Sequence, residues 1–67
     1  MPDAIATYEV LSPTAAIVEV TYTNGRLGIA RVDVRFAADL YEAAYGAASV
    51  KATMQGDRLG SFRQVTA

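Results

Sequence analysis

The sequence contains no cysteine and no histidine, and charge of either sign is sparse. Without cysteine the chain forms no disulfide and offers no thiolate ligand, and the redox compartment stays undecided. Without histidine as well, the usual zinc sites and the Ser–His and Cys–His catalytic arrangements are excluded. The carboxylates are scattered, and no glycine loop with the Lys-Ser/Thr ending of a phosphate site occurs. We therefore expect a protein that is not an enzyme and that holds no cofactor and no metal.

The charges nearly cancel, with six Lys+Arg against seven Asp+Glu and a formal net charge of −1. A general nucleic-acid binder carries a strong basic excess, so this balance argues against that class while leaving a local basic patch open. No run of about 18 apolar residues is present, and residues 1–3 lack the basic and apolar regions of a signal peptide. We expect a cytoplasmic protein with no membrane partner.

The length of 67 residues predicts a single domain covering residues 1–67. A chain of this size buries only about 60% of the surface that its unfolded form exposes, so small domains usually need a disulfide, a metal or a partner. Hydrophobic residues nevertheless make up 52% of the sequence. We expect part of this apolar surface to contact another protein or a second copy of the chain, which favours a homo-oligomer such as a homodimer.

The motif Arg-Leu-Gly-x-x-Arg occurs twice, at residues 26–31 and 58–63. A shift of 32 positions also matches Ala15, Ala16, Val18 and Thr21 with identical residues in the second half. A fixed period indicates one supersecondary unit used twice. The sequence therefore predicts two repeat units, at about 4–35 and 37–67, that pack about a pseudo-two-fold axis.

The clearest local element is a β-hairpin with its turn at Asn24-Gly25. Residues 16–23 alternate between two faces with a period of two, and Asn-Gly suits the positive φ values of a two-residue turn. The return strand runs over 26–36. Upstream, Ile5–Leu11 reads as another strand, although a short helix is an alternative, and Ser12–Thr14 reads as a turn around a proline. Together these segments predict an antiparallel three-stranded meander.

The apolar residues of the return strand change phase between Ile29 and Val32. An uninterrupted strand would send these two side chains to opposite faces, so we expect a β-bulge near Ala30-Arg31 that restores one apolar face. The bulge would bring Val18 opposite Val32 and Ala16 opposite Val34. The polar face would then hold Glu19, Thr21, Arg31, Asp33 and Arg35.

Residues 37–48 are rich in Ala, Leu, Glu and Tyr, which favours a helix. Asp39 is the expected N-cap, with Glu42 completing a capping box, and this reading is preferred over a catalytic acid pair. The inner stripe would hold Leu40, Ala43, Ala44 and Ala47. Because Gly46 is unfavourable inside a helix, we expect the helix to end near 45–48.

The last segment predicts a second hairpin. Residues 49–55 alternate, Gly56-Asp57 supplies a turn, and 58–65 form the return strand. The alternative is a helix that continues to Met54. The fold class predicted from the sequence is therefore α+β, a small β-dominated domain of order β-β-β-α-β-β with one short helix.

Two sets of side chains are candidates for partner binding. Arg26, Arg31, Arg58 and Arg63 stand at equivalent points of the two repeats, and a two-fold arrangement would bring their guanidinium groups onto one surface for carboxylates or phosphates. The alternative is solvated residues paired with Glu19 and Asp33. Tyr41 and Tyr45 lie four residues apart on the expected helix and share one side, where they either seal the helix to the sheet or form a contact patch.

Two segments resemble known families. Residues 20–25 (Val-Thr-Tyr-Thr-Asn-Gly), with 40–42 (Leu-Tyr-Glu) and 47–49 (Ala-Ala-Ser), resemble the small KTSC domain, which implies RNA binding. The central aromatic pair of that family is replaced here by Gly28, Ile29 and Ala30. Residues 36–46 (Phe-Ala-Ala-Asp-Leu-Tyr-Glu-Ala-Ala-Tyr-Gly) resemble a segment of a short type I-F anti-CRISPR family, which is strongly acidic whereas this chain is not. That second resemblance implies a phage or mobile-element inhibitor.

The sequence thus favours a small non-enzymatic module that acts through protein–protein contact, for example as an anti-CRISPR inhibitor. The contact would use Tyr41 and Tyr45 with nearby arginines. The alternatives are a nucleic-acid-binding module that uses the repeated arginines, and a structural component of a larger particle.

Overall fold

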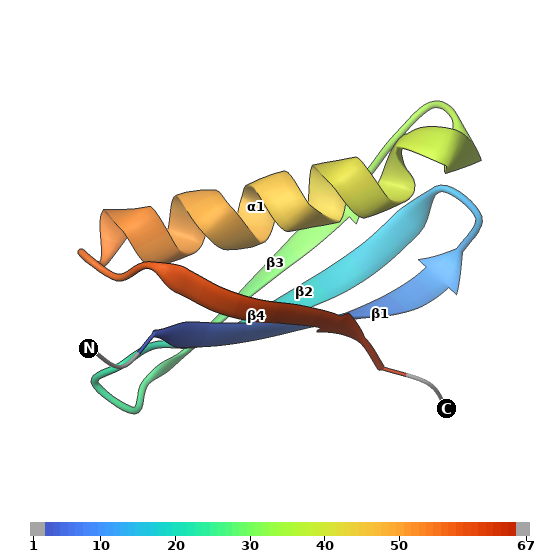
Figure 1. The fold of residues 1–67 in the computed structure, drawn as a ribbon. Helices are drawn as coiled ribbons and strands as arrows, with labels where there is room; N and C mark the ends of the chain where they lie inside the picture. The colour runs from blue at the N-terminus through green and yellow to red at the C-terminus, as the bar shows by residue number, and fades with distance from the viewer. Residues whose placement is uncertain (1–2, 66–67) are drawn as a thin grey trace.

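The computed structural model describes residues 3–65, which form one four-stranded sheet and one α-helix (Figure 1). The order of elements is β-β-β-α-β, so the α+β class and the three-stranded meander are confirmed. The elements are β1 (Ala4–Ser12), β2 (Ala15–Thr21), β3 (Leu27–Asp33), a short 3-10 helix η1 (Ala37–Asp39), α1 (Leu40–Met54) and β4 (Leu59–Gln64).

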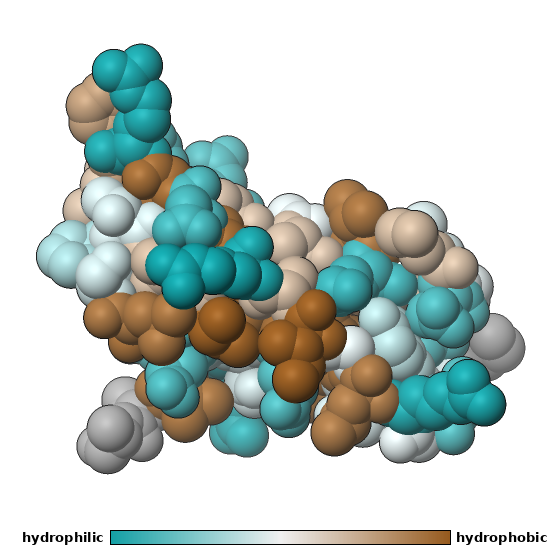
Figure 2. All heavy atoms as spheres, turned by 180° about the vertical axis from the view of Figure 1, so that it is seen from behind, coloured by the Kyte–Doolittle hydropathy of each residue, from teal (hydrophilic) through white to brown (hydrophobic). Residues whose placement is uncertain are grey.

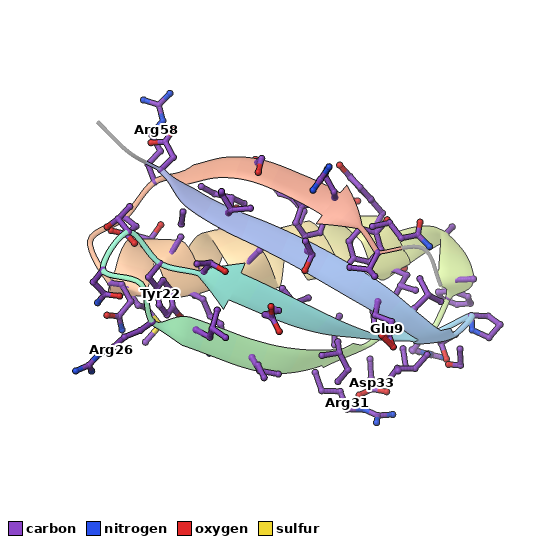
Figure 3. The ribbon with its side chains drawn as sticks, turned by 90° about the horizontal axis from the view of Figure 1, so that it is seen from below. Glu9, Tyr22, Arg26, Arg31, Asp33 and Arg58 are labelled. Carbon is purple, nitrogen blue, oxygen red and sulfur yellow. The ribbon has the colours of Figure 1, made fainter. Side chains whose placement is uncertain are left out.

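The strands are arranged in the order β3-β2-β1-β4. β1 pairs antiparallel with β2 and β2 with β3, whereas β4 runs parallel to β1. A parallel neighbour requires a crossover, and α1 supplies it by returning the chain across one face of the sheet (Figure 1). Figure 3 views the sheet from the opposite face, which no helix of residues 3–65 covers.

The predicted second hairpin is wrong, because residues 50–54 are the last turns of α1 and the final strand pairs with β1 instead. The alternating pattern of 49–55 is also compatible with a helix whose stripe repeats every four residues. Ala44, Ala48 and Ala52 are fully buried on that stripe. Packing of an apolar face supplies most of the stability of a helix in a protein. Burial of these alanines against the sheet therefore favours the helix over the predicted strand.

Gly46 does not end the helix, contrary to the expected stop near 45–48. It lies inside α1, and its cost of about 1 kcal/mol is outweighed by the packing of the turns that follow. The helix ends at Met54 with Gln55 as its C-cap, and Gly56 follows with a φ of 75° that suits a glycine. The backbone N–H groups of Gly56 and Asp57 donate to the carbonyls of Thr53 and Ala52, which is the Schellman arrangement.

The N-terminus of α1 confirms the position of the cap but not its chemistry. Asp39 is the N-cap residue, yet its side chain makes no capping hydrogen bond, so the predicted capping box with Glu42 is wrong. The 3-10 turn η1 precedes the helix and closes with a hydrogen bond from the Asp39 N–H to the Phe36 carbonyl. This turn holds Asp39 in helical dihedral angles (φ −91°, ψ −6°), which a side-chain cap does not normally adopt.

The β2–β3 hairpin is confirmed, but its turn has three residues rather than two. The Gly25 N–H donates to the Tyr22 carbonyl, the Tyr22 N–H donates to the Arg26 carbonyl, and only Gly25 has positive φ (87°). This is a type I turn followed by a left-handed glycine. Asn24 instead accepts a hydrogen bond from the Arg26 N–H through its side chain.

The predicted bulge near Ala30-Arg31 is wrong as well, because β2 and β3 pair without any register shift. Val18 lies opposite Ala30, and Ala16 lies opposite Val32. The change of apolar phase in the sequence is therefore real. It places Leu27 and Ile29 on the uncovered face of the sheet, where 59% and 62% of their surfaces are exposed.

The internal repeat is not visible in the fold. Residues 15–21 form β2, whereas the matching residues 47–53 lie in α1. Only the twin arginine motifs keep a common role, because each of them leads into a strand at an edge of the sheet.

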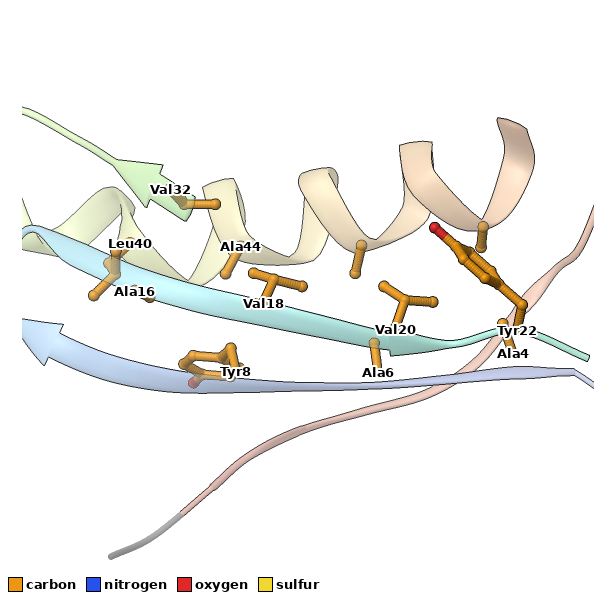
Figure 4. Packing of buried hydrophobic residues seen from close by; sticks show 12 residues of the cluster. Ala4, Ala6, Tyr8, Ala16, Val18, Val20, Tyr22, Val32, Leu40 and Ala44 are labelled. Carbon is orange, nitrogen blue, oxygen red and sulfur yellow. The ribbon is translucent and has the colours of Figure 1, made fainter. Parts of the chain in front are cut away.

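The core is narrow and built mostly of small side chains (Figure 4). The largest fully buried residues are Val18 and Val20, and the alanines of β1, β2 and α1 fill the rest. Small side chains let the helix approach the sheet closely. Tyr22 lies at one end of this row and Leu40 at the other (Figure 4), as expected for Tyr22 on the inner face.

Candidate binding surface

An aromatic cluster joins the helix to the last strand. The ring of Phe62 in β4 stacks on Tyr8 at 4.8 Å between centroids, and Tyr41 and Tyr45 of α1 meet it edge-on at 5.5 and 5.4 Å. Tyr8 also contacts Tyr41 edge-on at 5.9 Å. Edge-to-face pairs of this kind add stabilisation beyond the area that they bury.

The exposed part of this cluster is called here the aromatic surface and consists of Tyr41, Tyr45 and Phe62. The two tyrosines remain 58% and 47% exposed although their rings contact Phe62. Together with Leu59, Gly60 and Ser61 the aromatic surface lines an open hollow of about 180 Å³. The rings are thus held in place on one side and presented to solvent on the other.

The sequence positions these rings in two ways. Residues four apart lie on one side of a helix, so Tyr41 and Tyr45 share a side as predicted. Phe62 was missed by the sequence analysis, because its place depends on the parallel pairing of β4 with β1. Ala6 lies opposite Phe62, and both project toward α1. Alternation in 58–65 indicated a strand, but no local signal named its neighbour.

Hydrogen bonds at both ends of β4 hold Phe62 beneath the helix. The Ala4 N–H donates to the Arg58 carbonyl and the Val65 N–H donates to the Tyr8 carbonyl, each at 2.8 Å. The Tyr8 hydroxyl donates to the Gln64 side chain at 3.4 Å. The aromatic surface therefore rests on paired strands rather than on a loop.

The four candidate arginines do not form one basic patch. Arg26 lies in the β2–β3 turn and Arg58 in the segment before β4; Figure 3 shows them at one end of the sheet but beyond opposite edges. Arg31 lies at the other end of β3, and Arg63 lies in β4. All four are exposed. Their separation follows from the absence of the predicted two-fold arrangement.

Arg31 is paired with an acid on its own strand. Its Nε lies 3.0 Å from an Asp33 carboxylate oxygen, and this hydrogen bond and charge raise the pKa of Arg31. For Arg31 the alternative prediction therefore holds, namely a solvent-exposed arginine paired with Asp33. An exposed pair of this kind contributes little to stability.

Asp57 holds the β2–β3 turn against the end of α1. The Thr23 backbone N–H and hydroxyl donate to its two carboxylate oxygens at 2.8 and 2.7 Å. These bonds, the backbone one first, favour the ionised carboxylate and lower the pKa of Asp57. Asp57 therefore connects two loops that are 34 residues apart in the chain.

Three further findings bear on function. In residues 3–65, no group of three or more acidic side chains is arranged to hold a metal ion. The 15-residue α1 is too short to cross a membrane, and the described chain offers no longer helix. Comparison with protein families, with curated proteins and with solved structures finds no match.

Proposed function

We propose that the protein is a non-enzymatic binding module that covers a site on a partner protein with its aromatic surface. The observation that carries the proposal is the half-exposure of Tyr41 and Tyr45 over Phe62. Tyrosines anchored in this way lose little conformational entropy on binding, and each offers a large apolar area with one polar group. The adjoining hollow gives a protruding side chain of the partner a place to insert.

Among such binding functions we favour inhibition: the protein would be an inhibitor of a phage or mobile-element type, such as an anti-CRISPR. Residues 36–46, which resemble the anti-CRISPR segment, include both Tyr41 and Tyr45. An inhibitor that acts by occupying a surface needs no reactive group. It needs a rigid patch, and pairing of β4 with β1 on one side and α1 on the other supply that rigidity.

The test uses the type I-F CRISPR effector complex in purified form and in cells. We expect the immobilised wild-type protein to capture the complex and to restore plaques of a phage that the system targets. The double variant Tyr41→Ala, Tyr45→Ala should lose both effects. Leu11→Ala is the matched control, because Leu11 is a large exposed apolar residue of β1 outside the aromatic surface.

Each result has a separate meaning. Failure of the wild-type protein to capture the complex contradicts the inhibitor form. Equal capture by the double variant, with an unchanged circular dichroism spectrum, contradicts the aromatic surface. Tight binding of a single-stranded RNA probe that weakens steeply with salt would instead favour the nucleic-acid alternative. Growth of the protein into large particles on a sizing column would favour the structural-component alternative.

A further inference from the structure

The strand β3 has one edge without a neighbour among residues 3–65, since it pairs with β2 alone. The Val34 N–H donates to the Thr14 carbonyl, and the Tyr22 N–H donates to the Arg26 carbonyl. Hydrogen-bonded pairs alternate along an antiparallel ladder, so the even-numbered residues of β3 bond to β2. The N–H and C=O groups of the odd-numbered residues point away from the sheet: Leu27, Ile29, Arg31 and Asp33.

This edge carries one exposed pair of opposite charges, Arg31 and Asp33, but it lacks the other usual features that prevent strand addition. β3 is seven residues long, pairs without a register shift, and contains neither proline nor lysine. Leu27 and Ile29 add exposed apolar side chains next to the free backbone groups. Natural sheets blunt such edges with bulges, charges or covering segments, so an edge that is regular and apolar at Leu27 and Ile29 is suited to pair with a partner strand.

The opposite edge of the sheet, formed by β4, is irregular and therefore less suited to strand addition. β4 has a register shift at its start, where Leu59 lies opposite Ala4 but Ser61 lies opposite the next residue. Its uncovered-face side chains are Ser61 and Arg63. Of the two edges, β3 is therefore the one suited to strand pairing.

The charges of the β3 edge favour a second copy of this chain over a charged partner. Arg31 and Asp33 are the only charged residues of the strand, and they neutralise each other. Two such edges do not repel. An antiparallel pair of identical strands also satisfies the free groups of both partners through one two-fold axis.

The helix adds apolar surface on the same side. Tyr41 and Tyr45 face β4, so the opposite flank of α1 faces β3; by the spacing of 3.6 residues per turn it carries Val50 and Met54. Met54 is 77% exposed. Figure 2 shows hydrophobic side chains in a band across this side of the molecule. The inner face of β3 carries small residues, Gly28 and Ala30, and the Tyr22 ring packs over Gly28.

We propose that β3 pairs antiparallel with β3 of a second copy about a two-fold axis at Ile29, joining two four-stranded sheets into one. An axis at Arg31 would set like charges directly opposite each other and is unfavourable. An axis at Ile29 brings Leu27 and Ile29 of both copies together. Each Arg31 then lies opposite a Leu27, along which its aliphatic stem packs.

This inference goes beyond the proposed function and involves different residues. The aromatic surface contacts β4, at the far end of the strand order from β3. A dimer through β3 therefore leaves both copies of the aromatic surface exposed, one at each end of the joined sheet. Loss of dimerisation and loss of partner capture can thus be measured separately.

The test is a scan with single cysteines, which is direct because the chain has none of its own. In a two-fold pair only the residue on the axis meets its own counterpart. We expect Ile29→Cys to form a disulfide-linked dimer on oxidation several-fold faster than Ala30→Cys, Arg31→Cys or Val32→Cys. Ser61→Cys, the equivalent position of the second motif, is the control on the other edge.

A second measurement does not depend on cysteine chemistry. Sedimentation of the wild-type protein should give twice the monomer mass at high concentration, and Ile29→Lys should remain monomeric with an unchanged circular dichroism spectrum. Ile5→Lys, on the uncovered face of a central strand, should still dimerise. A wild-type protein that stays monomeric at every concentration overturns the proposal. Linking at Ala30 or Val32 in preference to Ile29 overturns the proposed axis.

Discussion

The two Arg-Leu-Gly-x-x-Arg motifs have the same sequence pattern and different surroundings. Each motif starts one residue before an edge strand, β3 for the first motif and β4 for the second. Leu27 points to the uncovered face and is mostly exposed, whereas Leu59 is partly buried against the core. A motif of six residues therefore specifies an extended strand start but not the face to which its leucine turns.

The difference arises from the neighbouring strand. β3 follows β2 through a tight turn, so its register is fixed locally and Leu27 falls opposite Thr21. β4 arrives from a helix and joins β1 in parallel, with Leu59 opposite the buried Ala4. A register shift at Gly60 then returns Arg63 to the same face as Arg31. Pairing partner and register, not motif, decide burial.

The largest effect that separates the motifs is expected at their leucines. Leu59→Ala should lower the free energy of unfolding by about 2 kcal/mol, because it removes methyl and methylene groups packed on the core. Leu27→Ala should change it by less than about 0.5 kcal/mol in dilute, monomeric protein. Urea unfolding followed by circular dichroism measures both. Equal losses would mean that the two leucines share one environment after all.

The glycines give the next effect. A Cβ on Gly28 would clash with the Tyr22 hydroxyl, so Gly28→Ala must displace a buried ring and should cost about 1 kcal/mol. Gly46→Ala is the matched control: apart from its chain neighbours and the backbone of its own helix, no atom lies within 4 Å of the added carbon, and alanine should stabilise the helix by about 1 kcal/mol. Thermal unfolding should show shifts of opposite sign. A gain for Gly28→Ala would contradict the packing of Tyr22.

The smallest effect concerns Asp57, the residue just before the second motif, which bonds to the turn before the first motif. Since the Thr23 bonds lower the pKa of Asp57 in the folded state, their stabilisation is complete above the unfolded-state pKa of about 3.9. It is lost as the pH falls through the lower folded-state value. The stability advantage of wild type over Asp57→Asn should therefore shrink on acidification from pH 6 to pH 2.

Urea midpoints across that range measure this advantage. Thr23→Val keeps the backbone donor and removes the hydroxyl, so its stability should depend on pH in the same direction with a smaller amplitude. An advantage over Asp57→Asn that stays constant down to pH 2 would contradict the proposed role of the two bonds.

Local elements were predictable from the sequence, and elements set by distant pairing were not. The meander followed from alternation and turn residues near Pro13 and Gly25. The helix start was right, but its end was misplaced because Gly46 was weighed without the burial of Ala48 and Ala52. The final strand was found, yet its parallel union with β1 depends on a crossover that no short window reveals.

The candidate site divides in the same way. Tyr41 and Tyr45 followed from helical spacing alone, whereas Phe62 becomes their neighbour only through the β1–β4 pair. The arginines were placed together on the strength of a two-fold repeat. Once 47–53 proved helical, the geometric basis for that grouping was gone.

The pairing of β4 with β1 also has a consequence for synthesis on the ribosome. Residues 4–8 must wait for residues 59–64 before that ladder forms, so the meander and helix emerge first with β1 unpaired on one side. Loop closure over this separation is slow relative to the hairpins. The nascent chain therefore exposes two unpaired strand edges, one on β1 and one on β3. A chaperone that covers these edges should help the folding chain more than the folded protein.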